Sequence, residues 1–170
     1  MNKLEQLESE ACEDGIEIIV YTFENPNIKG LYCDGVVGIS DSLENSTQKR
    51  CVLAEEMGHH HTSNGNILTM SSASNRQQEH RARIWGYQKL IDLDSIIAAY
   101  ENHCTNFYET AEFLNVTEQF LADTINAYMH KYGCYIKHKN YIIEFGYNSV
   151  GVIKNFWHKK KRLTKSTLKI

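Results

Sequence analysis

Apolar positions in the first forty residues have helical spacing at the start and strand-like spacing afterwards. Leu4, Leu7 and Ala11 are three and four residues apart, which predicts an amphipathic helix that Gly15 ends. A run rich in β-branched and aromatic residues follows, and two short apolar segments then flank Asp34–Gly35, a dipeptide typical of hairpin turns. The predicted elements are a helix over 1–14, a strand over 16–23 and a hairpin of 30–33 with 35–40.

Beyond residue 45 the apolar spacing is mostly helical, and strand-like alternation returns only near the carboxyl end. The predicted helices cover about 48–61, 75–90, 92–103, 106–114 and 117–132, with a polar and mobile connection over 67–75 and strand-like segments within 134–157. This order predicts an α+β fold, in which a small antiparallel β-sheet precedes a helical layer.

Composition restricts the class of protein. The chain is 42% hydrophobic and 23% charged, which is ordinary for a globular domain, and 170 residues suffice for a real core. No apolar run approaches the roughly 18 residues of a membrane span, and the amino terminus lacks a signal-peptide profile. Five cysteines without a C-x-x-C pair favour buried free thiols in a reducing compartment. We therefore expect a cytoplasmic protein without membrane contact.

Charge is unevenly distributed, although the net value is only -3. Residues 1–153 carry 11 basic and 21 acidic groups, whereas 154–170 carry seven basic groups and no acidic one. This division predicts an acidic domain over 1–153 followed by a basic C-terminal tail over 154–170. Such a tail either stays solvated, or touches nucleic acid or another acidic surface.

The groups most capable of chemistry are concentrated in residues 53–63, LAEEMGHHHTS. Positions four apart share a helix face, so Glu55 and His59 point the same way and Glu56 projects from the adjacent face. That is the register of the zinc-peptidase pattern H-E-x-x-H, in which residues i and i+4 bind a metal and the glutamate activates water. Here Glu55 takes the place of the first histidine.

A peptidase metal site needs three protein ligands and an open position for water. The candidate for the third ligand is Glu79, early in the next predicted helix, because two antiparallel helices can bring positions 55, 59 and 79 together. The small Ala82 would let these helices approach closely. Gly58, which costs about 1 kcal/mol relative to alanine inside a helix, invites the same explanation.

Two other interpretations of the segment are open. Glu56 and His60 are also four apart, and form a second register in which Glu55 is the base. Alternatively, the acids are solvated and the histidines are a surface helix end whose imidazoles interact with terminal carbonyls. Against that, the apolar neighbours of the acids predict a largely buried helix, and buried acids need a partner.

The segments 52–63 (VLAEEMGHHHTS) and 79–87 (EHRARIWGY) resemble the ImmA/IrrE family of metallo-endopeptidases, most of all its short members from phages and mobile elements. The likeness begins at the strand Gly30–Leu31–Tyr32 and extends to about Gly133. It implies a zincin-like helical core with a small sheet, and cleavage of helix-turn-helix repressors or similar regulators.

By position, the resemblance implies that Glu56 is catalytic and that Glu55, His59 and Glu79 hold one divalent metal ion. His60 and His61 are candidates for orienting a ligand or stabilising an oxyanion. Carboxylate ligands shift preference towards harder cations, so Mn²⁺ and Fe²⁺ are alternatives to Zn²⁺. Two carboxylates also neutralise the cation, so a bound water should be less acidic than in a site with two histidines.

Residues 108–121 have the pattern of helix-turn-helix packing, with Ala111 small and Asn115 at the turn. A recognition helix in the major groove needs cations nearby, whereas Glu118 and Asp123 make this helix acidic. We therefore predict a structural helical hairpin over 106–132 within the domain, with direct nucleic-acid binding confined to the basic tail if it occurs.

The motif and the resemblance together predict a metal-dependent endopeptidase, and the resemblance implies that its protein substrate is a helix-turn-helix repressor or similar regulator of a phage or mobile element. The alternative is a relative that keeps the fold but has lost hydrolysis. Such a protein would act by binding a regulator, or DNA through its tail.

Overall fold

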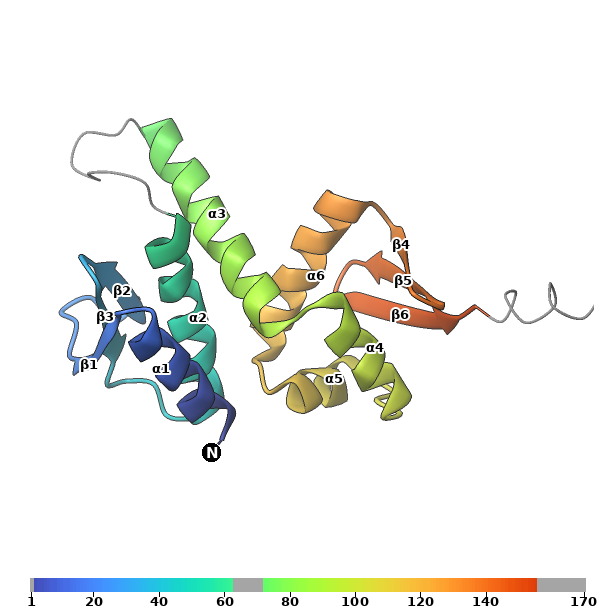
Figure 1. Ribbon diagram of the computed structural model, residues 1–170, viewed down its shortest axis with the longest axis horizontal. Helices are drawn as coiled ribbons and strands as arrows, with labels where there is room; N and C mark the ends of the chain where they lie inside the picture. Colours follow the sequence, from blue (N-terminus) through green and yellow to red (C-terminus); the bar gives the residue numbers. More distant parts are fainter. Residues whose placement is uncertain (1, 63–71, 156–170) are drawn as a thin grey trace, which may run out of the picture.

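The computed structural model describes residues 2–62 and 72–155. Figure 1 shows one small sheet and the first two helices at one end, a second small sheet at the other, and a long helix running between them. The elements are α1 (Lys3–Glu13), β1 (Glu17–Tyr21), β2 (Gly30–Cys33), β3 (Val36–Ser40), α2 (Ser46–Thr62), α3 (Ser72–Leu90), α4 (Leu93–Glu101), α5 (Phe107–Leu114), α6 (Glu118–Tyr132), β4 (Tyr135–His138), β5 (Tyr141–Gly146) and β6 (Ser149–Lys154).

The first sheet has the strand order β1-β3-β2. Its β2–β3 hairpin turns at Asp34–Gly35 as expected, and the two strands are antiparallel. The expectation of a purely antiparallel sheet is wrong in one respect, because β1 pairs with β3 in parallel. Strand β3 is the central strand and the most buried of the three, with Val37 and Ile39 in the core.

Helices α2 and α3 form the centre of the molecule and pack along each other through small residues. Helix α1 covers α2, and α2 in turn covers one face of the first sheet. The buried face of α2 includes Leu53, Ala54 and Met57. Helix α3 begins at Ser72, a turn earlier than the sequence pattern predicts, and the remainder of the expected polar connection, 67–71, lies outside the described residues.

Helices α5 and α6 form a tight helical hairpin. Asn115 ends α5 in the left-handed conformation at φ 57°, which asparagine tolerates, and the Thr117 side chain caps α6 by accepting from the Phe120 N–H. The buried Arg50 of α2 holds this hairpin, because its Nη1 donates to the carbonyl oxygens of Leu114 at 3.1 Å and Asn115 at 2.6 Å.

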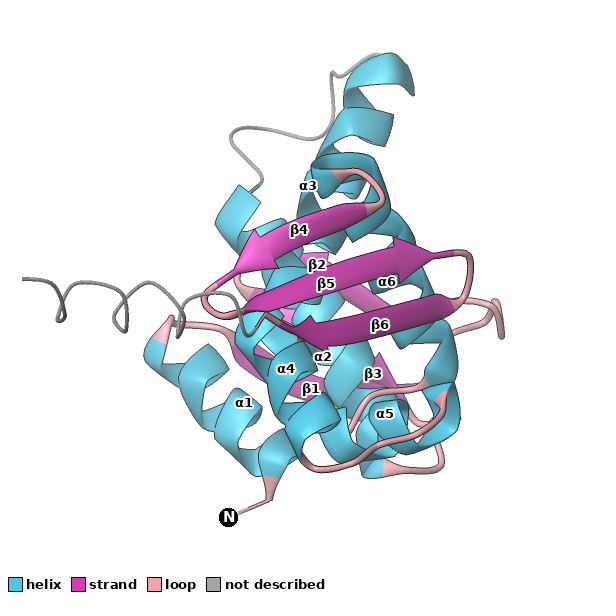
Figure 2. Ribbon diagram, turned by 90° about the vertical axis from the view of Figure 1, so that its right-hand side faces the viewer, coloured by secondary structure: helices cyan, strands magenta, loops and turns pink. Residues whose placement is uncertain are grey.

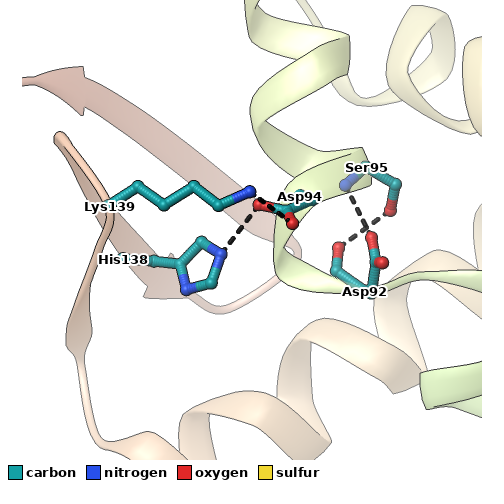
Figure 3. Close-up of polar contacts among 5 residues, drawn as sticks. All are labelled: Asp92, Asp94, Ser95, His138 and Lys139. Carbon is teal, nitrogen blue, oxygen red and sulfur yellow. Dashed lines mark hydrogen bonds and ion pairs between the residues drawn. The ribbon is translucent and has the colours of Figure 1, made fainter.

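The second sheet is an antiparallel meander of β4, β5 and β6. Ile143 and Phe145 on β5 are buried. Figure 2 shows this sheet from its outer side, with helices behind it. At one corner the β4–β5 turn is fastened to α4, where Asp94 accepts from His138 Nε2 at 2.8 Å and Lys139 Nζ at 2.6 Å (Figure 3). Lys154, the first residue of the basic tail, ends β6 and pairs with Glu101, whereas residues 156–170 lie outside the described part.

The structure confirms the α+β class, with two three-stranded sheets among the described residues. The cysteines are free, but the expectation that they are buried holds only for Cys51. Cys12, Cys33 and Cys134 are exposed. Within 2–62 and 72–155, no helix is both long and apolar enough to cross a membrane.

Candidate metal and catalytic site

His59 near the end of α2 and Glu79 early in α3 face each other across the two antiparallel helices. Their Nε2 and Oε2 atoms are 3.5 Å apart. This distance is longer than a good hydrogen bond. It matches the roughly 3.4 Å that separates two ligand atoms bound at 2.0–2.2 Å to one tetrahedral zinc ion. An imidazole nitrogen and a carboxylate oxygen in this arrangement therefore fit two positions of a divalent-metal site.

These two side chains line a cavity of about 340 Å³ between α2, α3 and strand β2. Glu56 lines the same cavity, and its carboxylate accepts a hydrogen bond from the backbone N–H of Tyr32. Strand β2 approaches α2 this closely because residue 30 is glycine: a Cβ there would stand 2.8 Å from Glu56 Oε1. The complete lining is Gly30, Leu31, Tyr32, Glu56, His59, Asn75, Gln78 and Glu79.

Glu56 has the electrostatic character of a proton carrier. Burial raises its pKa to about 7, and the neighbouring charges of Glu55 and Glu79 act in the same direction. The hydrogen bond from the Tyr32 backbone opposes this rise only in part. A carboxyl group with a pKa near neutrality both accepts and releases a proton readily under physiological conditions.

Glu55 does not line the cavity. Burial raises its pKa, Arg83 opposes that rise, and Asp123 and Glu79 add to it. Arg83 also lies beside Glu79, with 3.6 Å between Arg83 Nη2 and Glu79 Oε1. The guanidinium is thus a cationic neighbour of both carboxylates.

The remaining histidines of α2 have partners of their own. His60 Nδ1 is 3.0 Å from the Tyr32 hydroxyl, which also accepts from the Gly35 N–H. His61 Nε2 is 3.1 Å from Asp14 Oδ2, and its ring stacks on Trp85 at 4.4 Å between centroids. Both imidazoles therefore tie α2 to neighbouring elements, and neither lines the cavity.

The structure brings together three of the four principal residues expected from the sequence, namely Glu56, His59 and Glu79. Within 2–62 and 72–155, no group of three or more His, Cys, Asp or Glu side chains is arranged as a complete metal site. The second register, Glu56 with His60, is less favoured by the geometry, because the His60 ring turns to Tyr32 and lies outside the lining.

Sequence reasoning did not single out Tyr32 as a site residue. Its backbone holds Glu56 and its hydroxyl holds His60, so one residue of β2 contacts two of the α2 side chains. The available signal was the strand Gly30–Leu31–Tyr32, which preceded the motif helix in the resemblance. Asn75 and Gln78, also in the lining, lie on the same turn of α3 as Glu79 and carried no signal of their own.

The fold and this cavity define a metallopeptidase-like α+β domain. In a comparison with protein-family models, residues 12–126 match a peptidase family described as the IrrE N-terminal-like domain. The chain belongs to this family, whose peptidases are generally metal-dependent. Comparisons with curated proteins and with solved structures gave no match. The matched region ends within α6, so the second sheet lies beyond it.

Proposed function

We propose that this protein is a metal-dependent endopeptidase that cleaves a helix-turn-helix transcriptional repressor, or a similar regulator, of a phage or mobile element. The observation that carries the proposal is the convergence of His59, Glu79 and Glu56 on one cavity beside strand β2. Membership of the peptidase family supports the reaction class, and the resemblance to the short ImmA/IrrE members supports the choice of substrate.

In this proposal His59 and Glu79 hold a divalent cation. Zn²⁺ is the first ion to test, followed by Mn²⁺ and Fe²⁺. Glu55 is the third ligand that the sequence pattern implies, and it lies within electrostatic range of Glu79. The cation, when bound, supplies a Lewis acid that polarises the scissile carbonyl.

Glu56 is the proton carrier of the reaction. Its carboxylate takes a proton from the attacking water and returns it to the leaving amine, for which a pKa near 7 is suitable. The hydrogen bond from the Tyr32 backbone favours the ionised carboxylate and opposes part of the rise in its pKa.

The first test is metal binding. Clustered carboxylates without a cation repel one another, so a bound divalent ion should stabilise the fold by about 2.7 kcal/mol at a hundredfold excess over Kd. Melting temperature is measured with Zn²⁺, Mn²⁺ or Fe²⁺ for the wild type and for His59→Ala. The wild type should gain stability and the variant should not. An equal response in both would remove His59 from the ligand set.

The second test is cleavage. Purified protein is incubated with helix-turn-helix regulators from the same genome, beginning with the one encoded nearest to it. Fragments should accumulate with wild type, and Glu56→Gln should abolish them while retaining metal binding. Cleavage that continues unchanged in Glu56→Gln would exclude Glu56 as the base.

A second candidate function is regulator binding without hydrolysis. It is favoured by the position of Glu55, which lies outside the lining and beside Arg83. Stable association of the wild type with an intact regulator in the presence of metal, without fragments, would distinguish this function from endopeptidase activity.

A further inference from the structure

Within residues 2–62 and 72–155, no helix covers one face of the first sheet. Helices α1 and α2 lie on the opposite face, where Val37 and Ile39 of β3 are buried. Strand register places Ile19 of β1 and Leu31 of β2 on either side of Gly38, all pointing away from the helices. We call this the outer sheet face; its residues are Glu17, Ile19, Tyr21, Leu31, Cys33, Val36 and Gly38.

The outer sheet face is apolar and accessible. Ile19 is 40% exposed, Tyr21 53% and Leu31 54%. Phe23 adds a ring that packs against Tyr21 at 5.0 Å between centroids and lies over Gly38, 3.5 Å from where a Cβ would be. A single exposed aliphatic side chain is ordinary, whereas neighbouring ones on one sheet face mark an interaction surface.

The charge around this surface is strongly one-sided. Between residues 17 and 44 the chain carries five acidic side chains and only one basic side chain, Lys29. All five acids are exposed: Glu17, Glu24, Asp34, Asp41 and Glu44. An apolar surface with an acidic surround is complementary to a partner that presents apolar side chains among lysines and arginines.

The outer sheet face is also continuous with the candidate active site. Leu31 belongs to both, because it points from the sheet face and lines the cavity that holds Glu56 and His59. A protein that docks on the sheet is therefore held within reach of the cavity without having to enter it.

We infer that the outer sheet face is the docking surface for the DNA-contacting face of the regulator. The inference rests on the proposed function for the identity of that partner. A helix-turn-helix regulator concentrates its lysines and arginines where it meets phosphate, and this is the face that an acidic, apolar sheet complements. Docking and DNA binding by the regulator should then be mutually exclusive.

The native cysteines allow a direct test on the unmodified chain. Cys33 is exposed on the outer sheet face, whereas Cys134 is exposed before β4, at the other end of the molecule. Maleimide alkylation of each is followed by mass spectrometry with and without the purified regulator. At a tenfold excess of regulator over Kd, mass action predicts roughly tenfold slower alkylation of Cys33 and an unchanged rate at Cys134. Added duplex DNA should restore the Cys33 rate.

A variant pair gives an independent measurement. Ile19→Ser with Tyr21→Ser removes two side chains of the outer sheet face, and Tyr135→Ser with Tyr147→Ser removes two exposed aromatic side chains near the second sheet. The first pair should raise the Kd for the regulator by about tenfold, and the second should leave it unchanged. The melting temperature of both proteins is measured alongside, because Tyr21 also packs against Phe23.

The outcomes separate this inference from the proposed function. Cleavage of the regulator without protection of Cys33 overturns the docking surface and leaves the endopeptidase intact. Protection of Cys33 without cleavage supports the surface and removes the endopeptidase function. Protection that persists in excess DNA, or the absence of any complex, overturns the inference.

Discussion

Gly58 of α2 lies directly against the backbone of Ala82 in α3: a Cβ at position 58 would stand 2.1 Å from the Ala82 carbonyl oxygen. One turn away the roles are exchanged, and a Cβ at Gly86 would be 2.8 Å from the Ala54 carbonyl oxygen. The two helices thus approach backbone to backbone. His59 follows Gly58 directly, so this approach is what brings its ring to α3.

The substitution Gly58→Ala should destabilise the protein. In an isolated helix, replacing glycine by alanine would increase helix stability by about 1 kcal/mol. Here the added methyl overlaps backbone atoms that cannot rotate away, and such overpacking typically costs 1–3 kcal/mol or more. We expect a net loss of about 2 kcal/mol in the free energy of unfolding, measured by urea denaturation. Gly151→Ala is the control, because its Cβ would meet Glu144 Oε2 at an ordinary 3.7 Å. Equal stability of both variants would contradict the close approach.

The pH dependence of stability should report on Glu56. Its pKa is about 7 in the folded metal-free protein, above the ordinary value of 4.5, so the unfolded chain ionises first as the pH rises. Stability is therefore highest below pH 4.5 for this group and is lost as the pH rises to about 7. The loss is at most about 3 kcal/mol, from 1.36 kcal/mol per pKa unit.

Glu56→Gln should remove that loss. As the pH rises from 4.5 to 7, we expect the free energy of unfolding of the variant to increase relative to that of the wild type, with unfolding measured in the presence of a chelator. A constant difference across this window would mean that Glu56 ionises normally in the folded state.

Arg83→Gln should lower the melting temperature of the metal-free protein but enlarge the rise in melting temperature that a divalent ion causes. The guanidinium offsets the charges of Glu55 and Glu79, so its removal lowers the metal-free melting temperature at neutral pH. Because the pair is exposed, the effect is below about 1 kcal/mol. The rise in melting temperature on adding a divalent ion should then be larger, since the guanidinium that repels the cation is gone. Arg81→Gln, exposed on the same helix, is the matched control and should leave this rise unchanged.

Arg50→Met should weaken the attachment of the α5–α6 hairpin to α2. The buried guanidinium satisfies the carbonyl oxygens of Leu114 and Asn115 at the end of α5. Methionine fills similar space but leaves both acceptors without this donor, which costs about 2–3 kcal/mol. Thermal unfolding measures the loss, with Lys137→Met on the exposed side of β4 as the neutral comparison. A melting temperature equal to that of Lys137→Met would argue against the two hydrogen bonds.

Local sequence patterns predicted most of the elements because the signals act over a few residues. The Asp34–Gly35 turn, the turn at Asn115 and the spacing of α2 each depend on near neighbours, and all three appear in the structure. The parallel pairing of β1 with β3 was not predicted. It depends on which strand is the most deeply buried, and that is decided by the helices packed against Val37 and Ile39.

In the candidate site too, local periodicity predicted some features and tertiary packing decided the others. Glu55 and His59 share a helix face by periodicity alone, yet only His59 reaches the cavity, because Glu55 lies against the part of α3 that carries Arg83. Tyr32 entered the site through the contact of β2 with α2, which Gly30 permits. No local pattern encodes that contact.

By itself the sequence determined the helical spacing of Glu55, Glu56 and His59, and the small residues at positions 58, 82 and 86. Tertiary structure decided which carboxylates face the cavity and how far burial raises the pKa of Glu56. It also placed Leu31 where the cavity meets an open sheet face. The physical reason is range: backbone periodicity acts within one element, whereas burial and charge depend on every element packed around a group.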